Sequence, residues 1–163
     1  MEHDIYWRIG VFVAVLLVLA LLERRAPRRA LIQPKGRRWR TNLGLVVIDT
    51  LVLRALALAV PVLAVAAAVD AGRLGWGLFN ALNWPWWVEF ALAVMILDLA
   101  IWTQHLITHK VPLFWRFHRV HHADRDFDVT TALRFHPVEI AGSAGVKVGL
   151  VYLLGPSALA VLV

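Results

Sequence analysis

The chain has 163 residues, of which 60% are hydrophobic, and its mean hydropathy is +0.68. Soluble domains are only about 45–50% apolar, and a globule of this size lacks the interior to bury the excess, so the composition excludes an ordinary soluble domain. The absence of cysteine excludes disulfides, thiolate zinc sites, iron–sulfur clusters and cysteine nucleophiles. The formal net charge is +6, but eight cations lie between Arg24 and Arg40, beside an apolar segment. This pattern is typical of a juxtamembrane loop, so we expect no nucleic-acid partner.

The first apolar segment, Ile5 to Leu22, is long enough to cross the hydrocarbon core of a bilayer as a helix. The acidic residues Glu2 and Asp4 precede it and arginines follow it, which reverses the charge order of a secretory signal peptide. The segment is therefore predicted to be an uncleaved membrane anchor. By the positive-inside rule, the basic loop from Glu23 to Thr41 is cytoplasmic and the N-terminus lies outside.

Three more apolar segments follow this loop. Pro27 and Pro34 argue against a continuous helix through the loop itself. Leu43 to Val69 and Trp87 to His109 are each long enough to span a bilayer. Ile140 to Leu154 contains a lysine and three glycines, which indicates a packed or half-inserted helix rather than a clean span.

These segments predict an all-α fold, a polytopic transmembrane helical bundle with a histidine cluster at its cytoplasmic face. We divide it into residues 1–42, an N-terminal membrane anchor with a basic cytoplasmic loop, and residues 43–163, a membrane domain. The expected location is a bacterial inner membrane. Because the last apolar segment stops at Val163 without a flanking charge, we expect the membrane domain to be truncated at its C-terminal end.

Six of the seven histidines fall between His105 and His136. His105 and His109 are four residues apart, so on a helix they lie on one face, one turn apart. A second group has the spacing i, i+3, i+4, which also fits one helical face, and it consists of His118, His121 and His122. Adjacent histidines differ by about 100° in direction on a helix, so the last two can reach two different ions.

Two facing groups of this kind would surround metal ions with imidazole, a ligand suited to iron, zinc, copper and nickel. Imidazole binds a metal only when it is neutral, so metal affinity should fall as the pH drops through the histidine pKa. The alternative is that these are unrelated polar histidines at a membrane surface. Five histidines in two groups with helical spacing favour metal binding over that alternative.

Three sequence motifs around these histidines resemble those of a known family, and they are LDLAIWTQHLITH, PLFWRFHRVHHAD and TTALRFHPVEI. They resemble the fatty acid hydroxylase and sterol desaturase family of membrane di-iron oxygenases, over a stretch from about Arg38 to the end of the chain. The resemblance implies five metal ligands, which are His105, His109, His118, His121 and His122. It also implies two iron ions, with zinc as a substitute, and an outer or additional ligand role for His136, with Glu139 in the same motif.

This chain departs from the family pattern in one respect. The family supplies a second set of histidines, ending in another H-x2-H-H, from a later segment, and this sequence stops before it. Five or six imidazoles cannot fully coordinate two metals. We therefore expect this chain alone to bind metal weakly or to be inactive.

Charged residues near the histidines have simpler explanations. Asp98 shares a helix face with His105 and His109 but lies about 10 Å deeper than His105 by helix rise. It can either hold a ligand histidine of another helix through its second ring nitrogen or make an interhelical hydrogen bond. A further set of charged residues is interpreted as a solvated face, and it comprises Arg116, Arg119, Asp124, Arg125, Asp126, Asp128 and Arg134.

The resulting hypothesis is a membrane non-haem di-iron oxidoreductase that hydroxylates or desaturates a lipid, a fatty acyl chain or sterol-like molecule, with dioxygen. Oxidation of an unactivated C–H bond needs a redox-active metal. No nucleotide or flavin motif is visible, so the electrons would come from a separate donor, a small cytochrome or a ferredoxin with its reductase. The alternatives are an inactive fragment with a structural or partner role, and a membrane haem-binding or metal-binding electron carrier.

Overall fold

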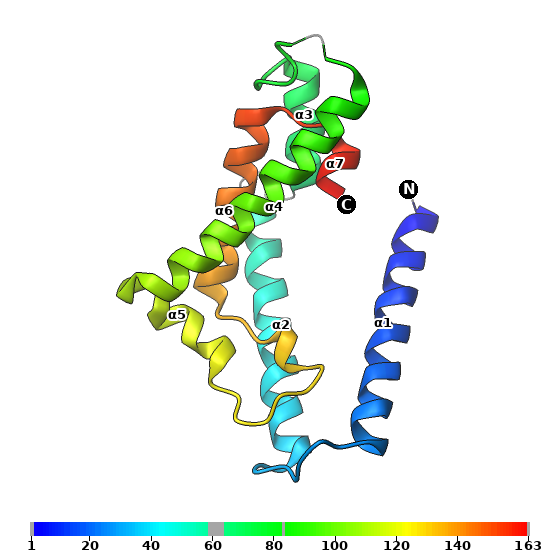
Figure 1. Cartoon of the computed structure of the whole chain (residues 1–163), viewed down its shortest axis with the longest axis vertical. Coiled ribbons are helices and arrows are strands. Elements are labelled where there is room, and N and C mark those ends of the chain that lie inside the picture. The colour runs from blue at the N-terminus through cyan, green and yellow to red at the C-terminus, as the bar shows by residue number, and fades with distance from the viewer. Residues whose placement is uncertain (1, 59–63, 83, 163) are drawn as a thin grey trace.

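The computed structural model describes residues 2–58, 64–82 and 84–162, without the side chains of residues 2–5 and 8. Seven α-helices and one short 3-10 helix make up most of the described chain, and they occur in the order α1 (Glu2–Arg25), α2 (Lys35–Ala57), α3 (Ala64–Leu74), α4 (Trp86–Lys110), α5 (Pro112–His122), η1 (Thr131–Leu133), α6 (Pro137–Leu154) and α7 (Ala158–Leu162) (Figure 1). No strand occurs within the described ranges. The predicted all-α class is confirmed for this part of the chain.

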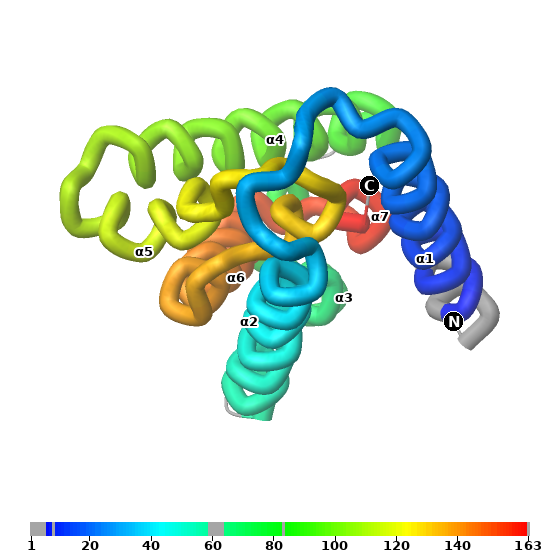
Figure 2. The backbone as a smooth tube through the Cα atoms, turned by 90° about the horizontal axis from the view of Figure 1, so that it is seen from below, coloured from blue at the N-terminus to red at the C-terminus, as the bar shows by residue number. Residues whose placement is uncertain are grey.

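The basic loop separates α1 from α2, as its two prolines predict. α1 ends at Arg25, and Pro34 lies at the N-cap of α2 with extended backbone. In Figures 1 and 2, α1 stands to one side of the other helices. The predicted second span is only partly reproduced, because α2 begins at Lys35 rather than at Leu43 and α3 is a separate helix. Residues 59–63 of that span lie outside the described residues.

Two described helices are long and apolar enough to cross a membrane, α4 and α6. The first matches the predicted third span. The second was expected to be a packed or half-inserted helix, yet its length and hydropathy suffice for a crossing despite its lysine. The described helices therefore indicate a membrane protein, while two candidate spans do not establish the predicted polytopic bundle.

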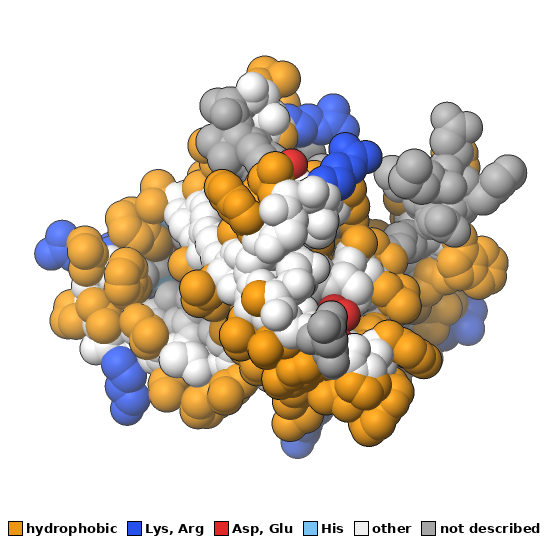
Figure 3. Space-filling view, turned by 90° about the horizontal axis from the view of Figure 1, so that it is seen from above, with side chains coloured by type: hydrophobic (Ala, Val, Ile, Leu, Met, Phe, Trp, Pro, Cys, Tyr) orange, Lys and Arg blue, Asp and Glu red, His pale blue; other side chains and the backbone are white. Residues whose placement is uncertain are grey.

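The distribution of apolar side chains also suits a lipid environment. Large side chains such as Met95 and Leu153 are more than 60% exposed, and apolar side chains cover much of the surface seen in Figure 3. The buried contacts instead involve small residues, including Ala67 and Ala68 of α3 against Val151 of α6. Small residues let membrane helices approach closely where burial from water provides no driving force.

The end of α6 is joined to the loop that follows α3. Gly155 ends α6 in the left-handed region, at φ 63°, and its N–H donates to the carbonyl of Val151 over 2.8 Å. Backbone N–H groups of Leu78 and Phe79 donate to the last carbonyls of α6, those of Leu153 and Leu154. Carbonyl groups that the helix itself leaves unpaired are thus satisfied by the α3–α4 loop.

Gly155→Ala should destabilise this junction. A Cβ at this position would lie 2.3 Å from the carbonyl oxygen of Trp76 and 2.4 Å from Nδ2 of Asn80, in a backbone conformation unfavourable to alanine. We expect the free energy of unfolding in detergent to fall by about 1–3 kcal/mol. Gly149→Ala is the control, since a Cβ there meets nothing within 4 Å. Equal destabilisation by both substitutions would contradict the prediction.

Candidate metal centre

A backbone reversal brings the two histidine-bearing helices together. Pro112 lacks an N–H and disfavours helical backbone at Val111, which takes φ −94° and ψ 117° at the end of α4. Pro112 is then suited to the first position of α5. The new helix returns beside α4, and the two lie next to each other in both backbone views (Figures 1 and 2).

Four imidazole rings converge between these helices. Nε2 of His109 lies 3.2 Å from Nε2 of His105 and 3.2 Å from Nε2 of His118. Nε2 of His122 lies a further 3.2 Å from Nε2 of His118. Each pair on one helix is four residues apart, which places both rings on the same helical face. We call His105, His109, His118 and His122 the imidazole cluster.

Hydrogen bonding alone accounts poorly for this arrangement. Nδ1 of His118 lies 2.6 Å from Oε1 of Glu139, so the ring proton is assigned to Nδ1 and Nε2 carries one lone pair. That nitrogen nevertheless has two Nε2 neighbours, those of His109 and His122. A cation accounts for the convergence, because imidazole nitrogens bound to one metal at about 2.0–2.1 Å would lie roughly 3.0–3.4 Å apart. The cluster therefore fits a metal ion, and the nitrogens of His105, His109 and His118 lie within 4.8 Å of one another.

The cluster is buried on one side and open on the other. His118 is fully buried, whereas His105, His109 and His122 are exposed. Burial lowers the pKa of His122, and the neighbouring imidazoles of His118 and His121 lower it further. A lowered pKa favours the neutral ring at physiological pH, which is the form that binds a metal.

Glu139 lies behind the cluster, in the first turn of α6. Its Oε1 accepts from His118, and its Oε2 is buried without a hydrogen-bond partner in the described structure. A carboxylate on the far nitrogen of a ligand histidine fixes the tautomer and ring orientation and raises the basicity of the ligand. The sequence motif singled out Glu139, and the structure places it where it orients His118.

A mostly apolar cavity of about 700 Å³ adjoins Glu139 between α4, α5 and α6. Thr108 and Ser143 are among its few polar wall residues. The apolar wall includes Leu99, Ile107, Phe114, Phe117, Val146 and Leu150. This shape and lining suit an apolar ligand, and the cavity reaches Glu139, the hydrogen-bond partner of His118.

The other predicted site residues bond to groups outside the imidazole cluster, although the His121 ring lies next to those of His118 and His122, with centroids 5.7 and 5.1 Å away. Nδ1 of His121 lies 3.2 Å from the carbonyl oxygen of Arg134, and the ring stacks on Phe135. His136 is the N-cap of α6, where its Nδ1 accepts from the N–H of Val138. Asp98 is exposed on α4 and makes no side-chain hydrogen bond to a described residue. Neither predicted partner of Asp98 is therefore found among the described residues.

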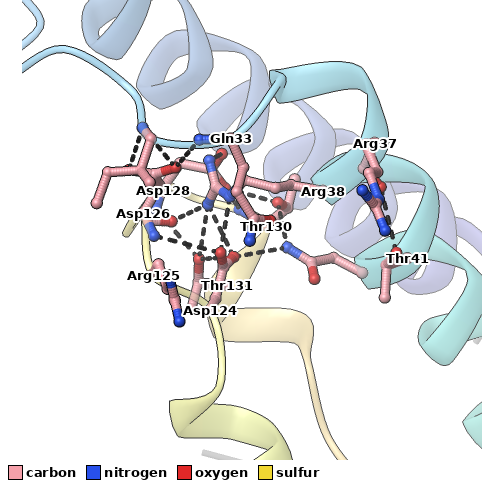
Figure 4. Close-up of polar contacts among 12 residues, drawn as sticks. Gln33, Arg37, Arg38, Thr41, Asp124, Arg125, Asp126, Asp128, Thr130 and Thr131 are labelled. Atoms are coloured by element: carbon pink, nitrogen blue, oxygen red, sulfur yellow. Dashed lines mark hydrogen bonds and ion pairs between the residues drawn. The ribbon is translucent and has the colours of Figure 1, made fainter.

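The prediction that the acidic residues after α5 form a solvated face is wrong. Asp124 and Asp126 are buried, and the guanidinium of Arg38 lies among them (Figure 4). The hydrogen bond from the backbone N–H of Ile32 lowers the pKa of Asp126, against the opposing effect of burial. Arg134 is half-buried, whereas Arg116, Arg119 and Arg125 are exposed as predicted.

The sequence analysis also missed the roles of Arg38 and Asn42. It assigned Arg38 to the basic cytoplasmic loop and Asn42 to the boundary between the two predicted units. Their acidic partners are more than 80 residues away, and helical spacing carries no information over that separation. One signal was present. Aspartates occupy every second position from 124 to 128. A loop that only contacts water does not need this regular spacing, so the spacing could have indicated a shared binding partner.

Comparisons with known proteins agree with this geometry. Residues 90–163 match the family model described as fatty acid hydroxylase, which confirms the predicted resemblance for this part of the chain. The chain is 35% identical over 51 residues to an alkylglycerol monooxygenase of Xenopus tropicalis, covering 31% of this chain and 10% of that protein. It is 29% identical over 68 residues to the alkylglycerol monooxygenase of Homo sapiens, covering 40% of this chain and 15% of that protein.

The chain thus spans only a small part of the length of these relatives. No solved structure matches it. The imidazole cluster is a site that could hold a metal ion, because His105, His109 and His118 each offer one ligand nitrogen there.

His118→Asn should abolish metal binding, because it removes the one ring that adjoins both His109 and His122 and leaves Glu139 without its partner. His136→Asn is the matched control, since asparagine also serves as an N-cap and this ring bonds away from the cluster. We expect the control to bind iron(II) or cobalt(II) with the stoichiometry of the unsubstituted protein. Elemental analysis after dialysis measures both, and equal metal loss in the two variants would reject the assignment.

Proposed function

We propose that this chain is part of a membrane non-haem di-iron oxygenase that hydroxylates the alkyl chain of a lipid with dioxygen. The observation that carries the proposal is the convergence of four imidazole nitrogens beside an apolar cavity. The cavity adjoins Glu139, which bonds to His118, so a lipid chain held there would lie close to the proposed iron ligands. The alternative reaction at the same chain is desaturation. The mass of the product distinguishes it from hydroxylation, because a desaturated lipid gains no oxygen atom.

The proposed iron ligands are the imidazole cluster and His121, with zinc able to occupy the same nitrogens. Bound iron would supply the one-electron chemistry with dioxygen that no protein side chain possesses. Overall, one oxygen atom enters a C–H bond and the other leaves as water. The two electrons and two protons that balance this reaction come from a separate donor, for which we propose a small cytochrome or a ferredoxin with its reductase.

The side chains around the centre have separate tasks in this proposal. Glu139 accepts a hydrogen bond from the Nδ1–H of His118 and so directs the Nε2 lone pair of that ring toward the metal. The apolar wall excludes water and holds the alkyl chain. The polar wall residues Thr103, Gln104, Thr108 and Ser143 are proposed to contact the end of the lipid that carries oxygen.

Alkylglycerols are the first substrates to test, because both relatives are named alkylglycerol monooxygenase. The centre is proposed to face the cytoplasm. The side chain of Arg29, in the basic loop, donates to the carbonyl of Arg125 after the histidine helix α5. Loop and cluster therefore lie on the same side of the molecule, and the positive-inside rule assigns that side to the cytoplasm, with the N-terminus outside.

A protein that joins this chain to the second histidine set of the family, placed in lipid nanodiscs, loaded with iron(II) and given a chemical reductant, should oxidise an alkylglycerol or fatty acyl chain under dioxygen. With isotopically heavy dioxygen, mass spectrometry should detect one labelled oxygen atom in the lipid. Lipid that loses two hydrogen atoms without gaining label would instead indicate desaturation. Metal-loaded protein that modifies neither lipid class would reject the proposal, and a Soret band in the purified protein would favour a haem-binding electron carrier.

Filling the cavity should separate substrate binding from metal binding. Gly142 lines the cavity, and a Cβ there meets nothing within 4 Å, so Gly142→Leu would occupy space intended for the alkyl chain. We expect unchanged iron content and at least a tenfold lower rate with long-chain substrates, equivalent to about 1.4 kcal/mol. Gly145→Leu is the control on the same helix, since Gly145 has equal free space but does not line the cavity. Equal rates for the two variants would contradict the assignment of this cavity.

A further inference from the structure

We propose that Arg38 and Asn42, at the start of α2, are positioning residues of the metal centre and act on His121 through Arg134. These two residues precede the segment that matches the family model, which begins at residue 90. The inference rests on the proposed function, because it assigns a purpose to the orientation of a proposed metal ligand.

Arg38 organises the segment that follows α5. Its side chain is 1% exposed, and it donates from Nε to Oδ1 of Asp124 over 2.7 Å and from Nη2 to Oδ2 over 2.8 Å. Nη1 donates to Oδ2 of Asp128 over 2.9 Å, and Nη2 also contacts the carbonyl oxygen of Asp126 (Figure 4). One guanidinium thus binds the carboxylates of Asp124 and Asp128 and the backbone carbonyl of Asp126, in the multidentate geometry for which arginine, unlike lysine, is suited.

The same segment binds the backbone that leads into α2. The Asp126 carboxylate accepts from the N–H groups of Ile32 and Gln33 over 2.8–3.0 Å. Asp126 itself is fully buried, and these two amides provide its carboxylate with the partners that a buried charge requires. Residues 32–38 and 124–128 therefore form one connected polar unit, and a shift of either moves the other.

Asn42 extends this unit toward the histidines. It is fully buried, and its Nδ2 donates to Oγ1 of Thr130 over 2.9 Å and to Asp124 over 3.2 Å. Its Oδ1 accepts from Nη1 of Arg134 over 3.1 Å. Nε of Arg134 donates over 2.7 Å to the carbonyl of Val120, in the last turn of α5. The Arg134 side chain therefore bridges α2 and the histidine helix.

The backbone of Arg134 contacts the neighbouring histidine directly. Its carbonyl oxygen lies 3.2 Å from Nδ1 of His121, which is the nitrogen that donates there, so Nε2 keeps its lone pair. Phe135 stacks on the ring with centroids 5.0 Å apart and planes 11° apart. Both contacts depend on where residues 134 and 135 lie, and Asn42 and Val120 determine this through the Arg134 guanidinium.

Two substitutions remove this connection with different side effects. Asn42→Ala deletes the acceptor for Arg134 along with the contacts to Asp124 and Thr130. Arg134→Lys keeps the positive charge, but one ammonium cannot reproduce the two-directional donation to Val120 and Asn42. Arg37→Ala is the control, because Arg37 is an exposed cation one position before Arg38.

The first measurement is a cobalt(II) titration of each variant in detergent, at a temperature where circular dichroism shows full helix content. We expect about a 10–100-fold loss of affinity and an altered visible spectrum for Asn42→Ala and Arg134→Lys, and neither change for Arg37→Ala. The second measurement is nitrogen NMR of the histidine rings in metal-free protein. We expect a single Nδ1–H tautomer for His121 in the unsubstituted protein and in the control, and a mixture in the other two.

The outcomes separate this inference from the proposed function. A lower melting temperature with unchanged cobalt affinity and an unchanged His121 tautomer would assign Arg134 a purely structural role and overturn the inference. If the unsubstituted protein binds no transition metal, the proposed function fails, and the tautomer measurement still decides whether Arg134 orients His121. Should Asn42→Ala fail to fold, Arg134→Lys alone carries both measurements.

Discussion

The reversal of the chain at Val111 and Pro112 is the constraint on which the imidazole cluster depends. A helix that continued past Lys110 would carry the second histidine group away from the first by about 1.5 Å for every residue. Because Pro112 ends α4 and begins α5, the rings of α5 return to the level of His105 and His109. The converging Nε2 atoms are therefore a consequence of one short backbone segment acting on two regular helices.

The helices and the histidine groups could be predicted because both depend on local spacing. Residues four apart on a helix share a face whatever the rest of the fold does, so the pairs His105–His109 and His118–His122 needed no tertiary information. The burial of Asp124 and Asp126 could not be predicted in this way. A carboxylate usually remains in contact with water, because removing its charge from water costs free energy. The guanidinium of Arg38, from a segment distant in the sequence, offsets this cost for Asp124. The exposed position of Asp98 shows the same limit, because sharing a helix face with histidines does not provide it with a partner.

Among the described residues, the interior holds many polar side chains, while the surface is largely apolar, unlike that of a soluble domain. Its fully buried side chains include His118, Asn42, Thr130 and Asp126, whereas large aliphatic residues of α4 and α6 are exposed. In lipid, an unpaired polar group is costly and an apolar surface is not. The interior is therefore available for the imidazole cluster and for the network around Arg38, while the outer surface requires only hydrophobicity.

A buried ion network is a poor means of stabilising a fold, because desolvation of the charges offsets most of their attraction. Its value lies in geometry, since a buried arginine bound to two carboxylates admits few alternative arrangements of the segments that it joins. The Arg38 network lies between the basic loop and the residues that contact His121. The predicted domain boundary at residue 42 also falls inside α2, at a side chain that bonds to Arg134. The start of α2 is thus part of the structural support of the histidine-bearing region, whatever its separation from that region in the sequence.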